Sequence, residues 1–222
     1  VPYRNRIRLA CEQGRAGFFN QAKRDGCSVL LPALSGAVEQ IVEITAEHSD
    51  LLIEVSSIEV RVSSADPRSG VFINGTFDSR PLEALLGASW IVSSSAYNQQ
   101  GSLKYSLGSD LVHSVPLACF VQVNETTNQK LLSYIASIVR FDGYQSFIDL
   151  YGGAGNHSAN LASVGLEGSL LELDVLACES AKNTFGEKVK VMSGDAIENL
   201  EAIPSADLVI CNPPRAGIKA GY

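Results

Sequence analysis

The second half of the chain alternates short apolar runs with stretches of helical periodicity. Four apolar runs predict strands, at Ser146–Leu150, Ser169–Leu173, Lys188–Met192 and Ala206–Cys211. Between them, the residue pattern predicts helices near 157–164, 176–185 and 196–201. Strands that alternate with helices build a parallel sheet with right-handed crossovers. The pattern therefore predicts an α/β domain with a Rossmann-like sheet, of which the chain supplies four strands.

The first half has a different pattern, in which most strands follow one another without a helix. We expect strands at Arg4–Glu12, Gly17–Gln21, Cys27–Leu31, Leu51–Ser63, Val71–Phe77, Ser89–Ala96 and Leu103–Leu107. Helices are expected from Pro32 to about His48, over Arg80–Leu86, and from Asn124 or Thr126 to Gly143. A turn is expected at 65–70. These elements predict a mainly antiparallel α+β domain over residues 1–119, followed by the α/β domain over residues 120–222.

Composition narrows the class of protein without identifying it. The 222 residues are 45% hydrophobic, and no apolar run approaches the roughly 20 residues of a membrane span. The five cysteines are scattered, which favours reduced thiols and a cytoplasmic location. The chain begins V-P-Y-R without an initiator methionine, so we expect a processed, trimmed or partial chain that acts as a monomer.

The net charge of −7 is unevenly distributed, because residues 1–25 carry six basic and two acidic side chains and are therefore basic. Arg4, Arg6 and Arg8 alternate along the chain, so on a strand they share one face. Such a ladder either contacts nucleic-acid phosphates or forms an ordinary solvated strand face. The charge pattern alone favours the solvated face.

A glycine turn follows the first strand of the α/β half, with Gly152, Gly153 and Gly155 after an apolar run and a helical stretch from Asn156. Strand, glycine turn and helix form the geometry in which backbone approaches a nucleotide-like ligand closely. The third glycine of G-x-G-x-x-G is absent, since Ser158 takes its place. This argues against a dinucleotide and leaves a nucleoside ligand such as S-adenosylmethionine.

Polar residues follow the other three strands of this half. Glu172 or Asp174 ends the second strand, Asp195 follows the third, and an N-P-P-R sequence begins at Asn212 after the fourth. The carboxyl ends of parallel strands form the ligand-binding edge of an open sheet, and an acid after the second strand commonly binds ribose hydroxyls. Each acid alone could be a helix cap, but several beside a glycine turn favour a binding site.

These residues occur in motifs that resemble the RNA uracil-5 methyltransferases, which form 5-methyluridine in tRNA and ribosomal RNA. The matched segments span nearly the whole chain, at Tyr3–Arg6, Cys27–Leu30, Phe120–Asn124, Asp149–Asn156 and Asn212–Gly217. The resemblance implies a class I methyltransferase fold of seven strands. It implies S-adenosylmethionine bound by Gln122, Tyr151, Gly153, Gly155, Asn156, Glu172, Asp195 and Asn212. It also implies RNA as the partner, either rRNA or tRNA, with the arginine ladder as the RNA contact.

The chain departs from the family at three positions. Gly152 stands where the family has Cys, His157 replaces an aromatic residue, and Asn212 replaces Asp. The N-P-P sequence is also similar to the signature of amino-group methyltransferases, although Arg215 is not aromatic. Three functions therefore stay open: uracil-C5 methylation of RNA, N-methylation of nucleic acid, and RNA binding without catalysis.

Methylation of uracil C5 requires a cysteine thiolate that adds to C6 and a base that removes the C5 proton. In the family both follow the matched N-P-P-R segment, so we expect them beyond Tyr222 and expect this chain alone to be inactive. Cys211 lies within an apolar run and is expected to be buried. Cys27 matches the last of four iron–sulfur ligands in many family members, and the other three would precede Val1. We therefore expect Cys27 to be a structural thiol unless upstream cysteines exist.

Overall fold

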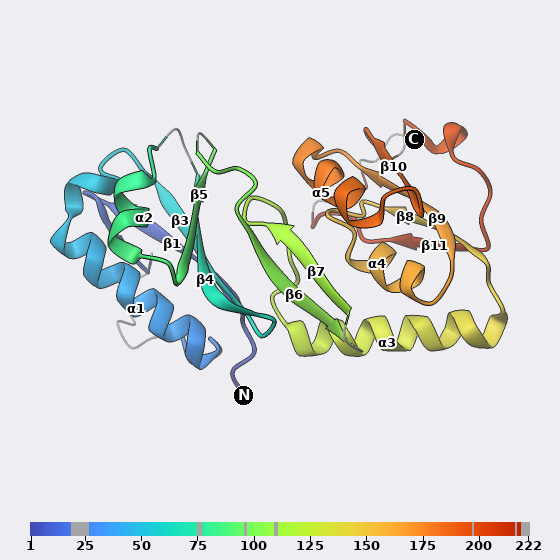
Figure 1. Cartoon of the computed structure of the whole chain (residues 1–222), viewed down its shortest axis with the longest axis horizontal. Coiled ribbons are helices and arrows are strands. Elements are labelled where there is room, and N and C mark those ends of the chain that lie inside the picture. Colours follow the sequence, from blue (N-terminus) through green and yellow to red (C-terminus); the bar gives the residue numbers. More distant parts are fainter. Residues whose placement is uncertain are drawn as a thin grey trace. The chain divides into compact units, whose positions relative to one another are not determined.

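The computed structural model describes residues 1–18, 27–74, 77–95, 97–108, 111–196, 198–215 and 217–218. The chain divides into two compact units (Figure 1). The first comprises residues 1–106, 116–118 and 122–126, and the second comprises residues 107–115, 119–121 and 127–222. Because the chain passes between the units more than once in this region, a single domain boundary at residue 119 stays a prediction.

The first unit is built on a five-stranded sheet with the order β2-β1-β3-β4-β5. Its strands are β1 (Arg6–Glu12), β2 (Arg15–Gly17), β3 (Ser57–Ser63), β4 (Asp66–Ile73) and β5 (Trp90–Ser94). Its helices are α1 (Pro32–Glu47), the 3-10 helix η1 (Ser49–Leu52) and α2 (Arg80–Leu86). Only β4 and β5 are parallel, and α2 connects them. This agrees with the expected α+β organisation.

The core of the first unit lies between one face of the sheet and its helices. Ile58 and Val60 of β3 alternate with polar neighbours and are buried beside Ile41 of α1. Pro32 opens α1, because its fixed φ suits the first helical position. Gly87 closes α2 with a φ of 73°, as the sequence predicts.

The predicted turn at 65–70 is wrong, because β4 begins at Asp66. The pairing with β3 shifts its register between Arg61 and Ser63. A bulge of this kind accommodates Pro67, which has no backbone N–H to donate to a ladder.

Other predicted strands also differ in the structure. Cys27–Leu31 forms no strand and contributes only an isolated bridge from Leu30 to Arg4. The predicted strand at Leu51–Ser63 starts only at Ser57. Most of the predicted strand Gly17–Gln21 lies outside the described residues. The sequence analysis missed β7 (Leu111–Pro116), which pairs with β6 (Ser102–Gly108) in a two-stranded sheet.

The second unit contains a four-stranded parallel sheet with the order β10-β9-β8-β11. Its strands are β8 (Ser146–Leu150), β9 (Glu167–Glu172), β10 (Val189–Ser193) and β11 (Leu208–Cys211). Its helices are α3 (Glu125–Asp142, which begins in the first unit), α4 (Asn156–Ser163), α5 (Val175–Phe185) and the 3-10 helix η2 (Leu200–Ala202). The α/β, Rossmann-like prediction is confirmed. Of the helix predicted at 196–201, the described residues show only the start of η2.

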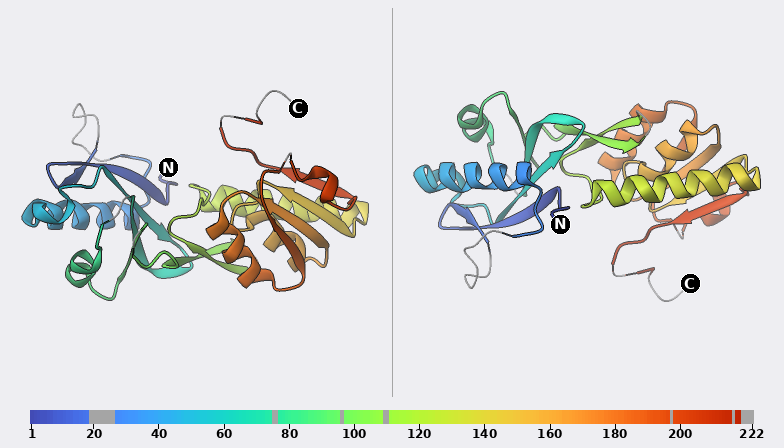
Figure 2. Two further views of the ribbon diagram at one scale, coloured as in Figure 1. Left: turned by 90° about the horizontal axis from the view of Figure 1, so that it is seen from above. Right: turned by 90° about the horizontal axis from the view of Figure 1, so that it is seen from below.

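The three long helices cover one face of this sheet (Figure 2). Phe147 and Leu170 point from neighbouring strands into a core shared with Leu132, Leu161 and Phe185 of the helices. β11 lies at an edge of the described sheet. In the part of the chain that the structure describes, no helix has both the length and the hydrophobicity to span a bilayer.

Candidate functional site

The carboxyl ends of the four parallel strands meet at one edge of the sheet. The chain moves from β8 to β9 and β10 on one side and returns to β11 on the other, so the strand order reverses between β8 and β11. Backbone bonds continue past the strand ends, from Gly152 N to Leu171 O (3.1 Å), Gly194 N to Glu172 O (2.9 Å) and Asn212 N to Leu150 O (3.3 Å). The residues predicted from three separate motifs therefore lie together at this edge.

The glycine turn has an unusual backbone. Tyr151, Gly153 and Gly155 have φ values of 59°, 57° and 97°, all in the left-handed region. A Cβ at Gly155 would also lie 2.5 Å from the ring of Phe185, so both the backbone conformation and the packing exclude a side chain at this position. A Cβ at Gly153 would meet no atom within 4 Å. The turn thus packs on the core at Gly155 and presents bare backbone to open space at Gly153.

Gly152 is a packing glycine, because its φ is not positive. A Cβ at this position would lie 2.6 Å from Cγ of Leu170, which is fully buried on β9. The family's Cys would not fit at this position here, because Leu170 occupies the space that its side chain would need.

Glu172 holds the glycine turn from the end of β9. Its carboxylate accepts hydrogen bonds from Gly153 N and Asp174 N, both at 2.8 Å. Asp174 instead caps α5, because its side chain accepts from Ala177 N at 3.0 Å. Of the two acids that the sequence left open, Glu172 lies at the turn and Asp174 serves the helix.

Asp195 and Tyr151 lie on the same edge. The Asp195 side chain accepts a hydrogen bond from Glu198 N at 3.4 Å. Burial, with the nearby carboxyl of Asp195, raises the pKa of Tyr151. Tyr151 is therefore a neutral phenol beside an acid.

The segment after β11 is open to solvent. Asn212 and Arg215 are exposed, and a turn forms where Gly217 N donates to Pro214 O at 2.8 Å. The expectation of a buried Cys211 is wrong, because this thiol is exposed. The reason is the edge position of β11, whose residues alternate between half-buried and exposed.

Two predicted ligand-binding residues have other surroundings. The carboxamide of Asn156 exchanges hydrogen bonds with Asn128 of α3, at 2.8 and 3.0 Å. Gln122 belongs to the first unit, where its carbonyl accepts from the Asn5 side chain at 3.1 Å. A part for Gln122 in the site stays a prediction.

Sequence reasoning missed a buried carboxylate beneath the turn. Asp149 of β8 is fully buried and accepts hydrogen bonds from Ser158 N and Oγ, at 3.1 and 2.7 Å. Nδ1 of His157, also buried, lies 3.8 Å from its other oxygen. Burial raises the pKa of Asp149, although His157 and Ser158 oppose the shift. The clue in the sequence was an acid inside an apolar run.

In the first unit, Arg6 and Arg8 share one face of β1, as predicted, whereas Arg4 precedes the strand. Both contact the carboxylate of Glu59 on β3, at 3.5 and 3.7 Å. Arg61 of β3 binds the same carboxylate through Nε at 2.6 Å and is only 2% exposed. We call Arg6, Arg8, Glu59 and Arg61 the arginine cluster. Neither Glu59 nor Arg61 was predicted.

A role for Cys27 as an iron–sulfur ligand stays a prediction, because the other three ligands were expected before Val1. Cys27 is half-buried and packs against the hydrophobic core. Within the described ranges, no group of three or more His, Cys, Asp or Glu side chains is arranged to hold a metal ion. The structural thiol is the interpretation that this packing favours.

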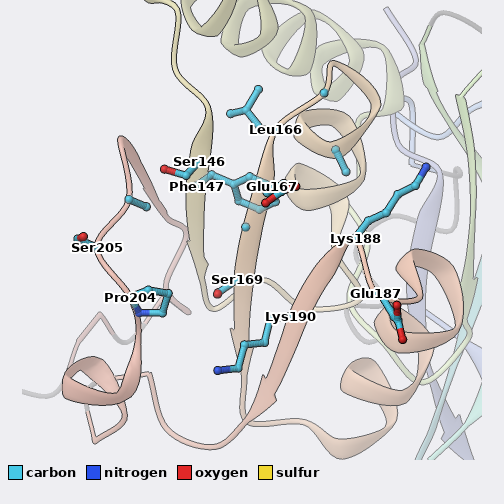
Figure 3. A pocket seen from close by; sticks show the side chains of 14 residues that line it. Ser146, Phe147, Leu166, Glu167, Ser169, Glu187, Lys188, Lys190, Pro204 and Ser205 are labelled. Atoms are coloured by element: carbon cyan, nitrogen blue, oxygen red, sulfur yellow. The ribbon is translucent and has the colours of Figure 1, made fainter.

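A hollow of about 620 Å³ lies at the opposite end of the parallel strands from the glycine turn (Figure 3). It is lined by residues at the amino ends of the strands, among them Ser146, Glu167, Lys188 and Lys190. Ligands of open α/β sheets bind at the carboxyl ends, so this hollow is not the expected donor site.

No family model matches the chain, but individual relatives do. It is 27% identical to an uncharacterised RNA methyltransferase of Bdellovibrio bacteriovorus, over 97% of this chain and 47% of that protein. It is also 27% identical to a 23S rRNA (uracil(1939)-C(5))-methyltransferase of Halomonas elongata, over 98% of this chain and 53% of that protein. The chain thus spans about half the length of these curated relatives.

A solved structure has a similar fold over nearly the whole chain. It is the tRNA (uracil-54, C5)-methyltransferase of Pyrococcus abyssi in complex with S-adenosyl-L-homocysteine, with a TM-score of 0.74 and 19% identity. The likeness covers 98% of this chain and 61% of that one. The sheet order, the glycine turn and this likeness define a Rossmann-like methyltransferase fold. Within that class, the chain resembles the RNA uracil-C5 methyltransferases, which confirms the resemblance that its motifs predicted.

Proposed function

We propose that this chain carries the methyl-donor site of an RNA uracil-C5 methyltransferase. The intact enzyme would transfer a methyl group from S-adenosylmethionine to C5 of a uridine in rRNA or tRNA. The observation that carries the proposal is the Glu172 carboxylate, held at the glycine turn by Gly153 N at 2.8 Å. Each carboxylate oxygen has lone pairs to spare after accepting one hydrogen bond, so Glu172 can also accept from ribose hydroxyls.

The neighbouring residues fit the other parts of such a donor. Gly153 leaves open space in which the ligand can approach the backbone. Tyr151 and Asp195 lie near each other at the same strand ends and suit the adenosine, and Asn212 follows the adjacent strand. Gly155 and Asn156 hold the end of the turn.

Calorimetric titration with S-adenosylhomocysteine tests the donor site directly. We expect the wild-type chain to bind and Glu172→Gln to lose about tenfold or more in affinity, because an amide nitrogen replaces one acceptor oxygen. Asp174→Asn is the matched control, since it changes the acid that caps α5, and its affinity should stay within about twofold. A wild-type chain that does not bind would favour the RNA-binding module without catalysis.

The methylation step itself needs a reactive thiolate, and four of the five cysteines of this chain are buried or packed against a core. Burial raises the pKa of Cys11 to about 11 and also raises that of Cys178. Cys119 is buried and Cys27 packs on the first unit's core, which leaves the exposed Cys211. We propose that this chain alone binds the donor without methylating RNA. Any transfer of a labelled methyl group to uridine-containing RNA would contradict this, and loss of that transfer in Cys211→Ser would assign the thiolate to Cys211.

RNA is the proposed partner, with Arg4, Arg6 and Arg8 as candidate phosphate contacts. Arg8 supports this because 66% of its side chain is exposed. Removing one phosphate contact should lower the slope of log affinity against log salt by about 1.

Product analysis of the intact enzyme separates uracil-C5 methylation from N-methylation through Asn212. The first function yields 5-methyluridine and the second yields a methylated exocyclic amine.

A further inference from the structure

Two helices of the second unit are joined by a ladder of amide hydrogen bonds. In its first rung, Nδ2 of Asn128 donates to Oδ1 of Asn156 at 2.8 Å, and Nδ2 of Asn156 donates back to Oδ1 of Asn128 at 3.0 Å. In its second rung, Nδ2 of Asn160 donates to the carbonyl of Leu132 at 3.0 Å. Asn128 and Asn160 are 7% and 8% exposed and Asn156 is half-buried, so the second rung is buried and the first is partly buried.

The spacing of the ladder matches on both helices. Asn156 and Asn160 are four residues apart on α4, and Asn128 and Leu132 are four apart on α3. Residues four apart lie on one face of a helix, so the rungs stack one turn above the other. A buried polar pair specifies register, because a shifted helix would leave its donors and acceptors unsatisfied.

The first rung lies at the N-terminal turn of α4. The N-cap of this helix is Gly155, which has no side chain to cap it, and the Asp149 carboxylate accepts from Ser158 N of the same turn at 3.1 Å. The next residue is Asn156, whose carboxamide is directed to α3. One carboxamide oxygen and one nitrogen from each partner are used in the reciprocal pair. Asp149 thus holds the first turn of α4 to β8, and the asparagine pair anchors the same turn to α3.

The glycine turn is connected directly to this anchor. Gly155 N donates to Gly152 O at 2.9 Å, and Ala159 N donates to Gly155 O at 2.8 Å. Gly153 lies within the turn that the first of these bonds closes, and its N–H donates to the Glu172 carboxylate. A change in the position of the first turn of α4 would therefore move the backbone that Glu172 holds.

We propose that Asn128 and Asn156 act as a positioning pair, which fixes the glycine turn for the donor without touching it. This role rests on the donor site proposed above. It assigns a function to Asn128, and it changes the expected role of Asn156 from a donor contact to a partner of α3.

A double-mutant cycle on S-adenosylhomocysteine affinity tests the pair, with calorimetry on the wild-type chain, Asn128→Ala, Asn156→Ala and the double variant. We expect each single variant to lose about tenfold in affinity and the double variant to lose no more than about that, because either change breaks the same pair. A direct donor contact predicts a different result, in which Asn156→Ala loses affinity and Asn128→Ala stays within about twofold. That result would overturn the proposal.

Asn160→Ala is the matched control, because it removes a buried asparagine of the same ladder one turn away from the glycine turn. We expect it to lower the melting temperature and to keep the affinity within about twofold to threefold. Affinities are measured where every variant is fully folded, as checked by circular dichroism. If Asn128→Ala lowers stability but leaves the affinity of the folded protein unchanged, the pair is only structural and the proposal is wrong.

Hydrogen exchange without ligand provides a second readout. The amides of Gly153 and Gly155 should exchange faster in both Asn128→Ala and Asn156→Ala and stay near the wild-type rate in Asn160→Ala. Unchanged exchange in the first two variants would contradict the role. A wild-type chain that fails to bind S-adenosylhomocysteine would overturn the proposed function and this role with it, whereas binding with unequal effects of the two asparagines overturns only the role.

Discussion

Each unit buries a carboxylate in its sheet, and the two carboxylates have different partners. Glu59 in the first unit, 9% exposed, is surrounded by the guanidinium groups of Arg6, Arg8 and Arg61. Asp149 in the second unit is fully buried beside hydroxyl, amide and imidazole groups. Arginines keep their charge throughout the pH range of folded proteins, whereas burial raises the pKa of the Asp149 carboxyl. We therefore expect changes of pH to affect the second unit more than the first.

Glu59→Gln should have the largest effect on stability. It removes the carboxylate that Arg61 contacts at 2.6 Å, and Arg61 is only 2% exposed. Breaking a buried ion pair from one side costs about 3–5 kcal/mol. Trp90, the single tryptophan, is buried in the first unit's core, so its fluorescence in urea reports this loss. A loss below about 1 kcal/mol would show that Arg61 does not depend on Glu59.

Asp149→Asn should have a smaller effect, about 1–2 kcal/mol at low pH, because the amide oxygen can still accept from Ser158. Burial raises the folded-state pKa of Asp149, so its contribution is present at low pH and is lost as the pH rises through that pKa. The difference between variant and wild type should therefore shrink as pH rises. Hydrogen exchange of β8 and β9 between pH 4.5 and 8 measures it, and a constant difference would contradict the prediction.

His113→Phe should remove part of the loss of stability that the second unit undergoes at low pH. His113 is 2% exposed and stacks on Phe185, with ring centroids 6.2 Å apart, and burial lowers its pKa from 6.5. A lowered histidine pKa gives stability that is full above about pH 6.5 and is lost as pH falls, by at most about 1.4 kcal/mol per pH unit. The phenylalanine variant should lose this acid dependence. His48→Gln in the first unit is the control and should leave it in place.

Arg8→Ala should have the smallest effect on stability. Its side chain is 66% exposed and its ion pair with Glu59 measures 3.7 Å, so the free energy of unfolding should change by less than about 0.5 kcal/mol. Urea unfolding followed by Trp90 measures this against Glu59→Gln. A loss as large as that of Glu59→Gln would mean that the exposed and buried arginines contribute alike.

The sequence predicted the α/β half more accurately than the α+β half. β8 of the α/β half has the predicted bounds because its apolar run is a local signal, and α2 of the first unit has them because Gly87 closes it. β4 was misplaced because Asp66, Pro67 and Gly70 are typical turn residues, and only the bulge opposite β3 makes them compatible with a strand. Local propensity carries no information about such a long-range partner.

The candidate site was predicted to a similar extent. Residues at strand ends were found, because parallel strands bring their carboxyl ends together whatever lies between them. The partners of these residues were missed: Asn128 is 28 positions from Asn156, and the sequence does not show that the two carboxamides meet. Charge alternation predicted the face of Arg6 and Arg8, but the opposing Glu59 comes from another strand.

The contact between Gly152 and Leu170 relates two positions that should vary together among relatives. Leu170 takes the volume that a side chain at position 152 would need, with only 2.6 Å between its Cγ and the missing Cβ. A relative with Cys at the position of Gly152, as in the family's motif, should therefore have a much smaller residue at the position of Leu170. Such a pair of exchanges would move the bulk from β9 to the glycine turn and would keep the packed volume between them constant.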